Sequence, residues 1–99
     1  MSNNPVLSRL GFARKAGRLS LGFEASKEAV TSNKAKLIIV ASDISAKTEK
    51  ETRFFAKEKC NVTKVDFTTE EISAAIGFRA GVVAVCDQGF ADAILKFLS

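Results

Sequence analysis

The sequence predicts an α/β protein, a three-layer α/β/α sandwich built on a mixed four-stranded sheet. Two continuous apolar runs, at residues 37–41 and 82–86, are rich in valine or isoleucine, which is typical of strands covered on both faces. Stretches with helical spacing of apolar residues separate the predicted strands. Strands that alternate with helices pack as a sheet between helical layers. The 99 residues suit one domain, expected over residues 1–99.

The first third of the chain contains two predicted helices joined by a short strand. Pro5 suits the first turn of a helix, and the apolar residues after it keep helical spacing to about residue 15. Gly17 ends this helix, and residues 19–21 alternate as in an edge strand. A second helix is expected over residues 23–32, with an apolar face and a charged face.

The middle third is expected to add two strands around a helix. Residues 37–41 form the first buried strand, and Asp43 and Ser45 after it are of the types that cap a helix. That helix is predicted over residues 46–59, and residues 62–67 alternate as in a third strand. The helix side chains expected to face the core are Phe54, Phe55 and Ala56.

The last third is expected to follow the same alternation. Residues 68–71 form a capping box that opens a short helix to about residue 76. A loop over residues 77–81 leads into the second buried strand, residues 82–86. The final helix, residues 88–98, has an apolar stripe at helical spacing. The order of the strands in the sheet does not follow from these patterns.

The charge of the chain is unevenly distributed. The net charge is +4, and residues 1–36 carry seven cations against two acids, whereas the rest of the chain is nearly balanced. A concentrated basic region favours an anionic partner, although a solvated basic face is the alternative interpretation. No apolar run is long enough for a membrane span, and the first residues lack a signal-peptide core, so we expect a cytoplasmic protein without a membrane partner.

A catalytic or metal site is not expected. The chain contains no histidine, and the widely separated Cys60 and Cys86 are expected to be buried, reduced thiols. Asp43 and Asp87 each follow a predicted buried strand, where the sites of α/β sheets often lie. They could form an acid–base or metal-binding pair, but aspartates in this position more often cap the next helix. We therefore expect a protein that is not an enzyme and has no metal or cofactor.

The most informative segment is residues 14–27, which surrounds a helix start with cations and glycines. Helix starts leave backbone N–H groups without partners and carry a positive dipole end, so they bind phosphate. Structured RNA is the favoured partner, since cations hold its backbone and apolar groups receive displaced bases. In this segment Glu24 could accept hydrogen bonds from a guanine edge. The candidate RNA-binding residues are Arg14, Lys15, Arg18, Gly22, Phe23, Glu24, Lys27 and Lys36, with Phe78, Arg79 and Ala80 from the second loop.

The same segments resemble a known family. Blocks reading LGFARKAG, GFEASK, LIIVASD, IG, AGVVAV and DQGFA occur in order at residues 10–17, 22–27, 37–43, 76–77, 80–85 and 87–91. This ordered set resembles the kink-turn-binding ribosomal protein family, which includes proteins of the L7Ae and L30e type and Gadd-like domains. It is most similar to the short bacterial YlxQ branch.

The resemblance implies an α/β/α fold that binds RNA kink-turns or related bends, with possible association with the ribosome. Family members read sheared G·A pairs with a helix start of glycine followed by Asn-Glu-x-x-Lys. Glu24 and Lys27 match the acidic and basic positions, while Phe23 stands where a polar residue is usual. The residues that match the second contact loop, expected to cover a flipped-out nucleotide, are Phe78, Arg79 and Ala80.

Two further points stay open at this stage. Phe23 could stack on a base or point into the core. A protein-interaction module on the same fold, with weak or non-specific RNA binding, is the alternative function, supported by Phe23 and by the acids of residues 43–71. We expect a monomer.

Overall fold

The computed structural model describes residues 4–98, and the predicted helices and strands are all present in them. Residues 1–3 and 99 of the expected domain lie outside the described residues. The elements are α1 (Pro5–Lys15), β1 (Leu19–Leu21), α2 (Phe23–Thr31), β2 (Leu37–Val40), α3 (Ala46–Ala56), β3 (Asn61–Lys64), α4 (Thr69–Ile76), β4 (Val82–Val85) and α5 (Gln88–Leu98).

The four strands form one mixed sheet in the order β1-β4-β2-β3. β2 and β3 are parallel, whereas β4 runs antiparallel to both of its neighbours, β1 and β2. The buried strands β2 and β4 therefore occupy the centre, and the short β1 and the polar β3 form the edges. This arrangement confirms the predicted fold class.

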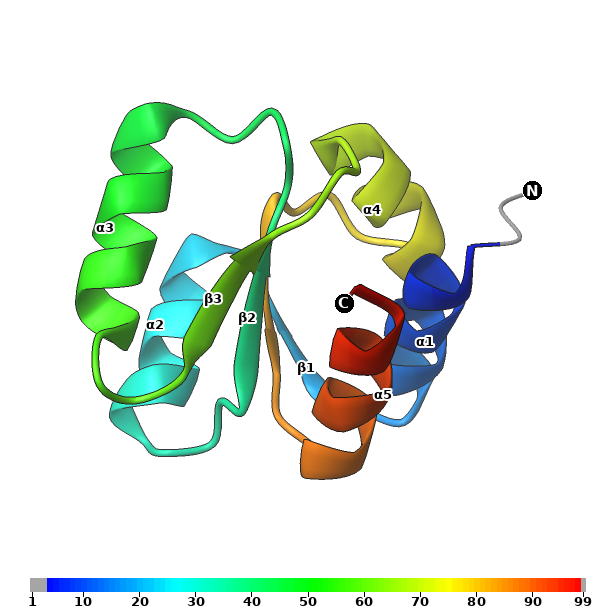
Figure 1. Cartoon of the computed structure of the whole chain (residues 1–99), viewed down its shortest axis with the longest axis horizontal. Helices are drawn as coiled ribbons and strands as arrows, with labels where there is room; N and C mark the ends of the chain where they lie inside the picture. The colour runs from blue at the N-terminus through cyan, green and yellow to red at the C-terminus, as the bar shows by residue number, and fades with distance from the viewer. Residues whose placement is uncertain (1–3, 99) are drawn as a thin grey trace.

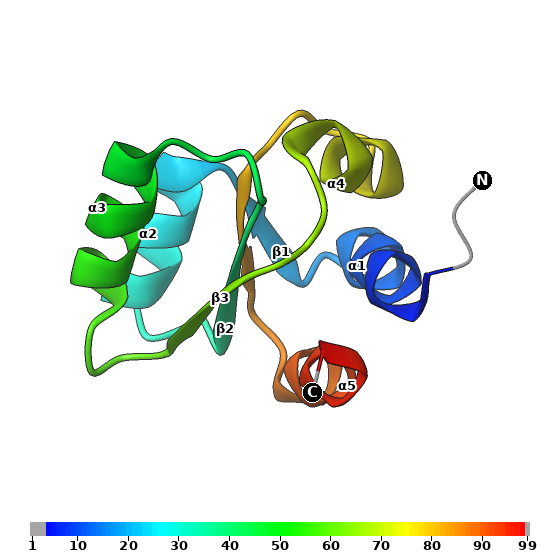
Figure 2. The same cartoon turned by 45° about the horizontal axis from the view of Figure 1, so that its top comes forward.

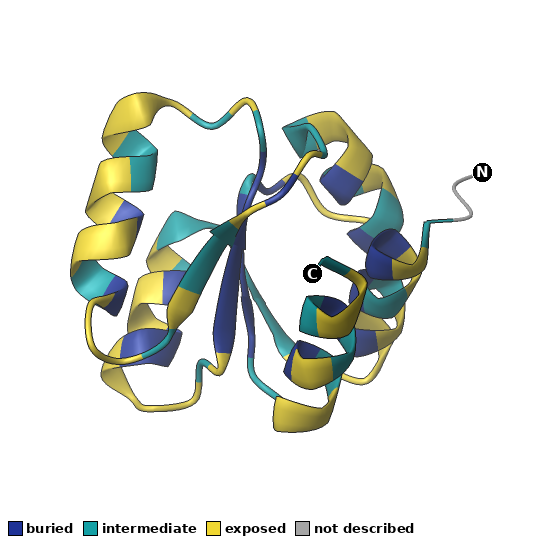
Figure 3. Ribbon diagram, viewed as in Figure 1, coloured by how far each residue is buried: buried dark blue, intermediate teal, exposed yellow. Residues whose placement is uncertain are grey.

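Helices cover both faces of the sheet, so the molecule has three layers (Figures 1 and 2). α2 and α3 pack on one face, and α1, α4 and α5 pack on the other. Successive side chains of β2 point to opposite faces, as in any strand. Leu37 and Ile39 join the core beneath α1, α4 and α5, while Ile38 and Val40 join the core beneath α2 and α3. Figure 3 shows this burial along β2 and β4.

Local capping determines where several helices begin. The Asn4 side chain accepts from Val6 N–H, with Pro5 in the first turn of α1. Ser45 Oγ accepts from Thr48 N–H at the start of α3. The capping box of α4 is complete, with Thr68 and Glu71 exchanging hydrogen bonds. These caps confirm the starts expected at these positions, because each depends on residues within one turn.

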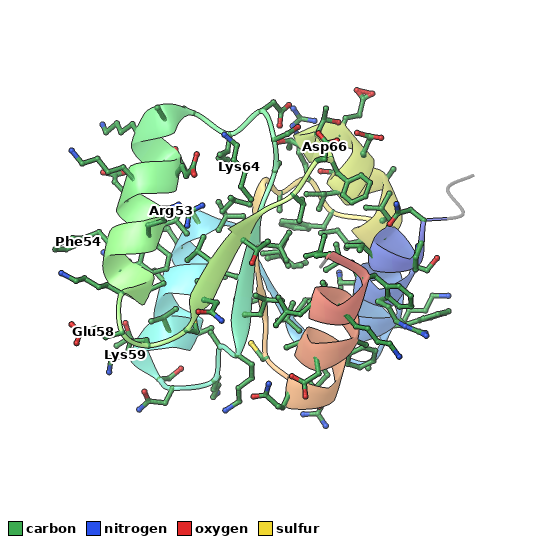
Figure 4. The ribbon with its side chains drawn as sticks, viewed as in Figure 1. Arg53, Phe54, Glu58, Lys59, Lys64 and Asp66 are labelled. Atoms are coloured by element: carbon green, nitrogen blue, oxygen red, sulfur yellow. The ribbon has the colours of Figure 1, made fainter. Side chains whose placement is uncertain are left out.

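The expectation that Phe54 faces the core is wrong, since its side chain is 79% exposed. Figure 4 shows it pointing away from the sheet. Thr52 and Ala56 are the buried positions of α3, one turn apart. Successive helical residues are 100° apart, so Phe54 lies on the side opposite both of them.

Smaller differences concern element ends and the two thiols. α3 ends at Ala56 rather than at residue 59, because Glu58 adopts a positive φ of 64° in the turn that follows. β3 ends at Lys64, three residues early, although Val65 N–H still bonds Val40 O. Cys60 and Cys86 are free thiols, as expected, but they are half-buried rather than buried.

Across residues 4–98, none of the helices combines the length and the apolarity that crossing a membrane requires.

Candidate functional site

The antiparallel direction of β4 brings three connections to one end of the sheet. β1 and β2 end where β4 begins, so Gly22 N–H donates to Val82 O at 2.8 Å and Ala41 N–H donates to Gly81 O at 2.9 Å. We call this end the upper edge and define it as residues 22–27, 41–45 and 77–81; it lies at the top of Figure 1. The start of α2 and the 77–81 loop, expected to meet, lie side by side there.

The start of α2 exposes backbone donors at this edge. Gly22 adopts φ 98° and ψ 170°, a conformation open essentially only to glycine, and no side chain caps the helix. The first-turn N–H groups are therefore left to solvent or to a ligand. Glu24 and Lys27 are both exposed on this helix. The geometry fits an anion-binding helix start with one acidic and one basic side chain beside it.

Phe23 is half-buried and packs against α3. Its ring meets Phe55 of α3 edge to face, with centroids 5.4 Å apart and planes at 71°. Phe23 therefore joins α2 to α3, and its half-exposed side chain also lines an open groove between these helices. Its expected contact with RNA stays a prediction.

A groove between α2 and α3 continues from the upper edge. It has a volume of about 580 Å³ and an aromatic floor. Its lining residues are Phe23, Lys27, Lys47, Lys50, Glu51, Phe54 and Phe55. Lys47 and Lys50 were missed by the sequence analysis. Their spacing of three residues on a predicted helix was available as a signal, but nothing local indicated that α3 would pack beside Lys27.

The 77–81 loop presents two of its expected contact residues and buries the third. Phe78 is 48% exposed and Arg79 is exposed, so both can reach a ligand. Ala80 is only 5% exposed, and its N–H donates to Ser73 Oγ. Gly81 has no room for a side chain, because an added Cβ would lie 2.8 Å from Ile44 Cδ1.

Asp43 links the upper edge to the start of α4 instead of capping α3. Its Oδ1 accepts from both the N–H and the hydroxyl of Thr69, each at 2.8 Å. These two donors hold the pKa of Asp43 below its usual value, and the nearby charge of Arg79 lowers it further. Asp43 thus ties the β2–α3 connection to the start of α4.

Four of the predicted cations do not lie at the upper edge. Cys86 N–H donates to Arg18 O, and Lys36 N–H donates to Val85 O, so both residues flank the end of β4. Arg14 lies in the last turn of α1, which leads into β1 at this same end. Lys15 lines a separate groove between α1 and α4, opposite Glu71. The structure therefore places Arg14, Arg18 and Lys36 at the opposite end of the sheet and Lys15 in the separate groove.

The two aspartates considered as a catalytic pair are also apart. Asp43 follows β2 at the upper edge, whereas Asp87 follows β4 at the opposite end. Asp87 Oδ2 accepts from Phe90 N–H, so it caps α5 as expected. Within the described residues, no cluster of three or more metal-ligating side chains occurs.

The fold and the upper edge together define a small α/β/α domain with an uncapped helix start beside a loop that exposes Phe78 and Arg79. Residues 5–95 match the family described as Ribosomal protein L7Ae/L30e/S12e/Gadd45 family. The chain belongs to this family, which confirms the resemblance read from the ordered sequence blocks.

The sequences of two relatives align with nearly the whole chain. The RNA-binding protein YlxQ of Bacillus subtilis is 33% identical, covering 99% of each chain. The large ribosomal subunit protein eL30 of Yarrowia lipolytica is also 33% identical, covering 99% of this chain and 93% of its own. These relatives are ribosomal and RNA-binding proteins, which agrees with the expectation that the chain is not an enzyme.

Solved structures share the fold. A protein from Bacillus halodurans, described as having unknown function, superposes with a TM-score of 0.91 at 28% identity, covering 97% of this chain and 98% of its own. The Giardia lamblia 15.5kD RNA binding protein superposes with a TM-score of 0.75, covering 95% of this chain and 82% of its own. At 13% identity the second match shows the fold alone.

Proposed function

We propose that this chain is a single-domain, non-enzymatic RNA-binding protein that recognises a bent, structured RNA, such as a kink-turn, at its upper edge. The hydrogen bond from Gly22 N–H to Val82 O carries the proposal, since it brings the α2 start and the 77–81 loop together. The names of the relatives from Bacillus subtilis and Yarrowia lipolytica support RNA binding and association with the ribosome.

Each exposed group at the upper edge has a role suited to its chemistry. The N–H groups that follow Gly22 and the side chains of Lys27 and Arg79 bind phosphates of the sharply bent strand. Glu24 accepts hydrogen bonds from the edge of a guanine in a non-Watson–Crick pair. Phe78 offers an apolar surface to an unstacked base.

The first experiment compares the affinities of the protein for a kink-turn RNA and for a straight duplex of equal length by fluorescence anisotropy. Tighter binding of the kink-turn is expected. Lys27→Ala should weaken binding and reduce the slope of log affinity against log salt by about 0.9, as for one lost phosphate contact. Lys57→Ala removes the same charge from an exposed position after α3 and serves as the control. An unchanged slope for Lys27→Ala would contradict its role.

Base reading by Glu24 has its own matched control. Glu24→Ala should lose about 1–3 kcal/mol of discrimination when the contacted guanine is replaced. Glu28→Ala removes an exposed acid one turn further along the same helix and should leave discrimination unchanged. Equal losses on every RNA would exclude base reading by Glu24.

The groove between α2 and α3 favours a second candidate function, a protein-interaction module with weak RNA binding. The observation behind it is Phe54, which is exposed beside the aromatic floor of the groove. Equal, weak binding of the kink-turn and the straight duplex would support this alternative. We further propose a cytoplasmic monomer, for which sedimentation should give a mass near 10.6 kDa.

A further inference from the structure

We infer that the end of the sheet opposite the upper edge is a second RNA-binding surface, which holds the backbone of a double-helical RNA segment. The inference extends the proposed function, because the protein would then join two RNA segments. We call this surface the lower edge. It is defined by four cations, Arg18, Lys34, Lys36 and Lys59.

The fold brings these cations together from three separate connections. Arg18 precedes β1, Lys34 and Lys36 precede β2, and Lys59 precedes β3. The three strands run side by side with β4 in one sheet, so their starts lie at one end. Figure 4 shows Lys59 at this end, at the bottom of the view.

The lower edge is concave. One hollow of about 440 Å³ is lined by residues that include Lys36 and Lys59, and another of about 580 Å³ by residues that include Arg18, Lys34 and Lys36. Lys36 and Asn33 line both hollows, so these adjoin. A continuous hollowed surface suits a rounded polymer better than scattered charges on a convex face.

The charge of this surface is not neutralised within the protein. No carboxylate lines either hollow, and in the described part of the chain the ion pairs involve only Glu49, Arg53 and Lys64, all near α3 and β3. Three acids lie close to lining residues without lining the hollows themselves. Asp92 Oδ1 accepts from Gln88 Nε2 at 2.8 Å, Asp87 Oδ2 accepts from Phe90 N–H, and Glu58 neighbours Lys59 in the chain. Free cations in a hollow attract a polyanion by releasing its counterions.

The residue types favour a duplex over a single strand. Single strands are held by stacking bases on aromatic side chains, and no aromatic residue lines either hollow. The uncharged polar side chains Asn33 and Asn61, which line the hollows, can bond phosphate oxygens and 2′-hydroxyls. Contacts of this kind recognise helical RNA by its shape rather than by its sequence.

The two edges are far enough apart for two RNA segments. β1 separates Arg18 from Gly22 by four residues, which is about 13 Å of extended chain. The two edges are therefore separate surfaces at opposite ends of the sheet. The backbone of Arg18 and Lys36 is hydrogen-bonded to β4, so the lower edge is held by the same sheet.

The test uses the full chain with two labelled RNAs, a kink-turn RNA and a straight duplex. The wild-type protein, saturated with kink-turn RNA, should bind the duplex in a ternary complex. The double variant Lys34→Ala/Lys36→Ala should lose about 60-fold in duplex affinity at 0.1 M salt, as for two lost phosphate contacts, and keep its kink-turn affinity. Both side chains are exposed, so an unchanged melting temperature should verify folding.

A reciprocal variant, Lys27→Ala/Arg79→Ala, removes the same charge from the upper edge. It should lose kink-turn binding and keep duplex binding, and Lys34→Arg/Lys36→Arg should restore the lower edge. Competition of the two RNAs for one site, or unchanged duplex binding by Lys34→Ala/Lys36→Ala, would overturn the inference. Binding of polyglutamate to the lower edge, with no binding of the duplex there, would also overturn the inference. Duplex binding that depends on Lys34 and Lys36 without any kink-turn binding would refute the proposed function alone.

Discussion

Among the glycines, Gly22 should be the one whose replacement lowers the free energy of unfolding most through backbone strain alone. Its φ of 98° and ψ of 170° are accessible essentially only to glycine, while an added Cβ would meet nothing within 4 Å. The cost of Gly22→Ala is therefore backbone strain of about 1–3 kcal/mol. The smaller freedom of the unfolded alanine chain returns about 0.4–1 kcal/mol, and the midpoints of the two ranges leave a net loss of about 1.3 kcal/mol. A domain of this size should then melt about 5–10 °C lower.

Gly17→Ala is the matched control, because Gly17 also has open space around its Cα but adopts a φ of only 71° in the ordinary left-handed region. It should lose less stability than Gly22→Ala in thermal unfolding followed by circular dichroism. At a temperature where both variants are folded, only Gly22→Ala should lose affinity for kink-turn RNA, because it turns the first N–H groups of α2. A wild-type melting temperature for Gly22→Ala would refute the strain argument. Equal RNA affinities of the two variants would refute the role of the α2 start.

Three further predictions concern stability. The donors on Thr69 lower the pKa of Asp43, so its stabilising effect is complete above the unfolded-state pKa near 4 and is lost as the pH falls through the folded-state pKa. Between pH 5 and pH 2, thermal melts of the wild type should therefore lose more stability than those of Asp43→Ala. Parallel losses in the two proteins would contradict this. Ser26 Oγ is buried without a hydrogen-bond partner among the described residues, so Ser26→Ala should stabilise the protein by about 0.5–1 kcal/mol in urea unfolding, and a loss would reveal a hidden partner. Phe54→Ser should change stability by less than about 0.5 kcal/mol in the same assay, whereas a larger loss would mean that its ring is packed.

The elements could be predicted from the sequence because their signals are local. The apolar run at residues 37–41 identified a strand buried on both faces, and β2 is covered by helices on each side. The capping box of Thr68 and Glu71 predicted the start of α4 from residues within one helical turn. Such features need no knowledge of the rest of the chain.

The environments of Phe54 and Asp43 could not be predicted from neighbouring residues in the sequence. Thr52 and Ala56 are the buried positions of α3, and the Thr52 hydroxyl donates to Thr48 O within the helix. This phase packs Phe55 against the core and leaves Phe54 on the exposed side. The expectations for Asp43 considered the helix that follows it and a pairing with Asp87. Its actual partner, Thr69, is 26 residues away in sequence and is brought close by the pairing of β2 with β3.

The direction of β4 decides where the 77–81 loop lies relative to the predicted basic residues. Had β4 run parallel to β1 and β2, its start would lie beside theirs, and the 77–81 loop would adjoin Arg18 and Lys36. Because β4 is antiparallel to both, its start adjoins Gly22 and its end adjoins Arg18 and Lys36. β1 itself separates the predicted cations of the first third of the chain, because Arg18 precedes this strand and Lys27 follows it. Sequence proximity predicted one basic site, whereas these two cations lie at opposite ends of the sheet, so the proposed RNA contacts at each end can be tested independently.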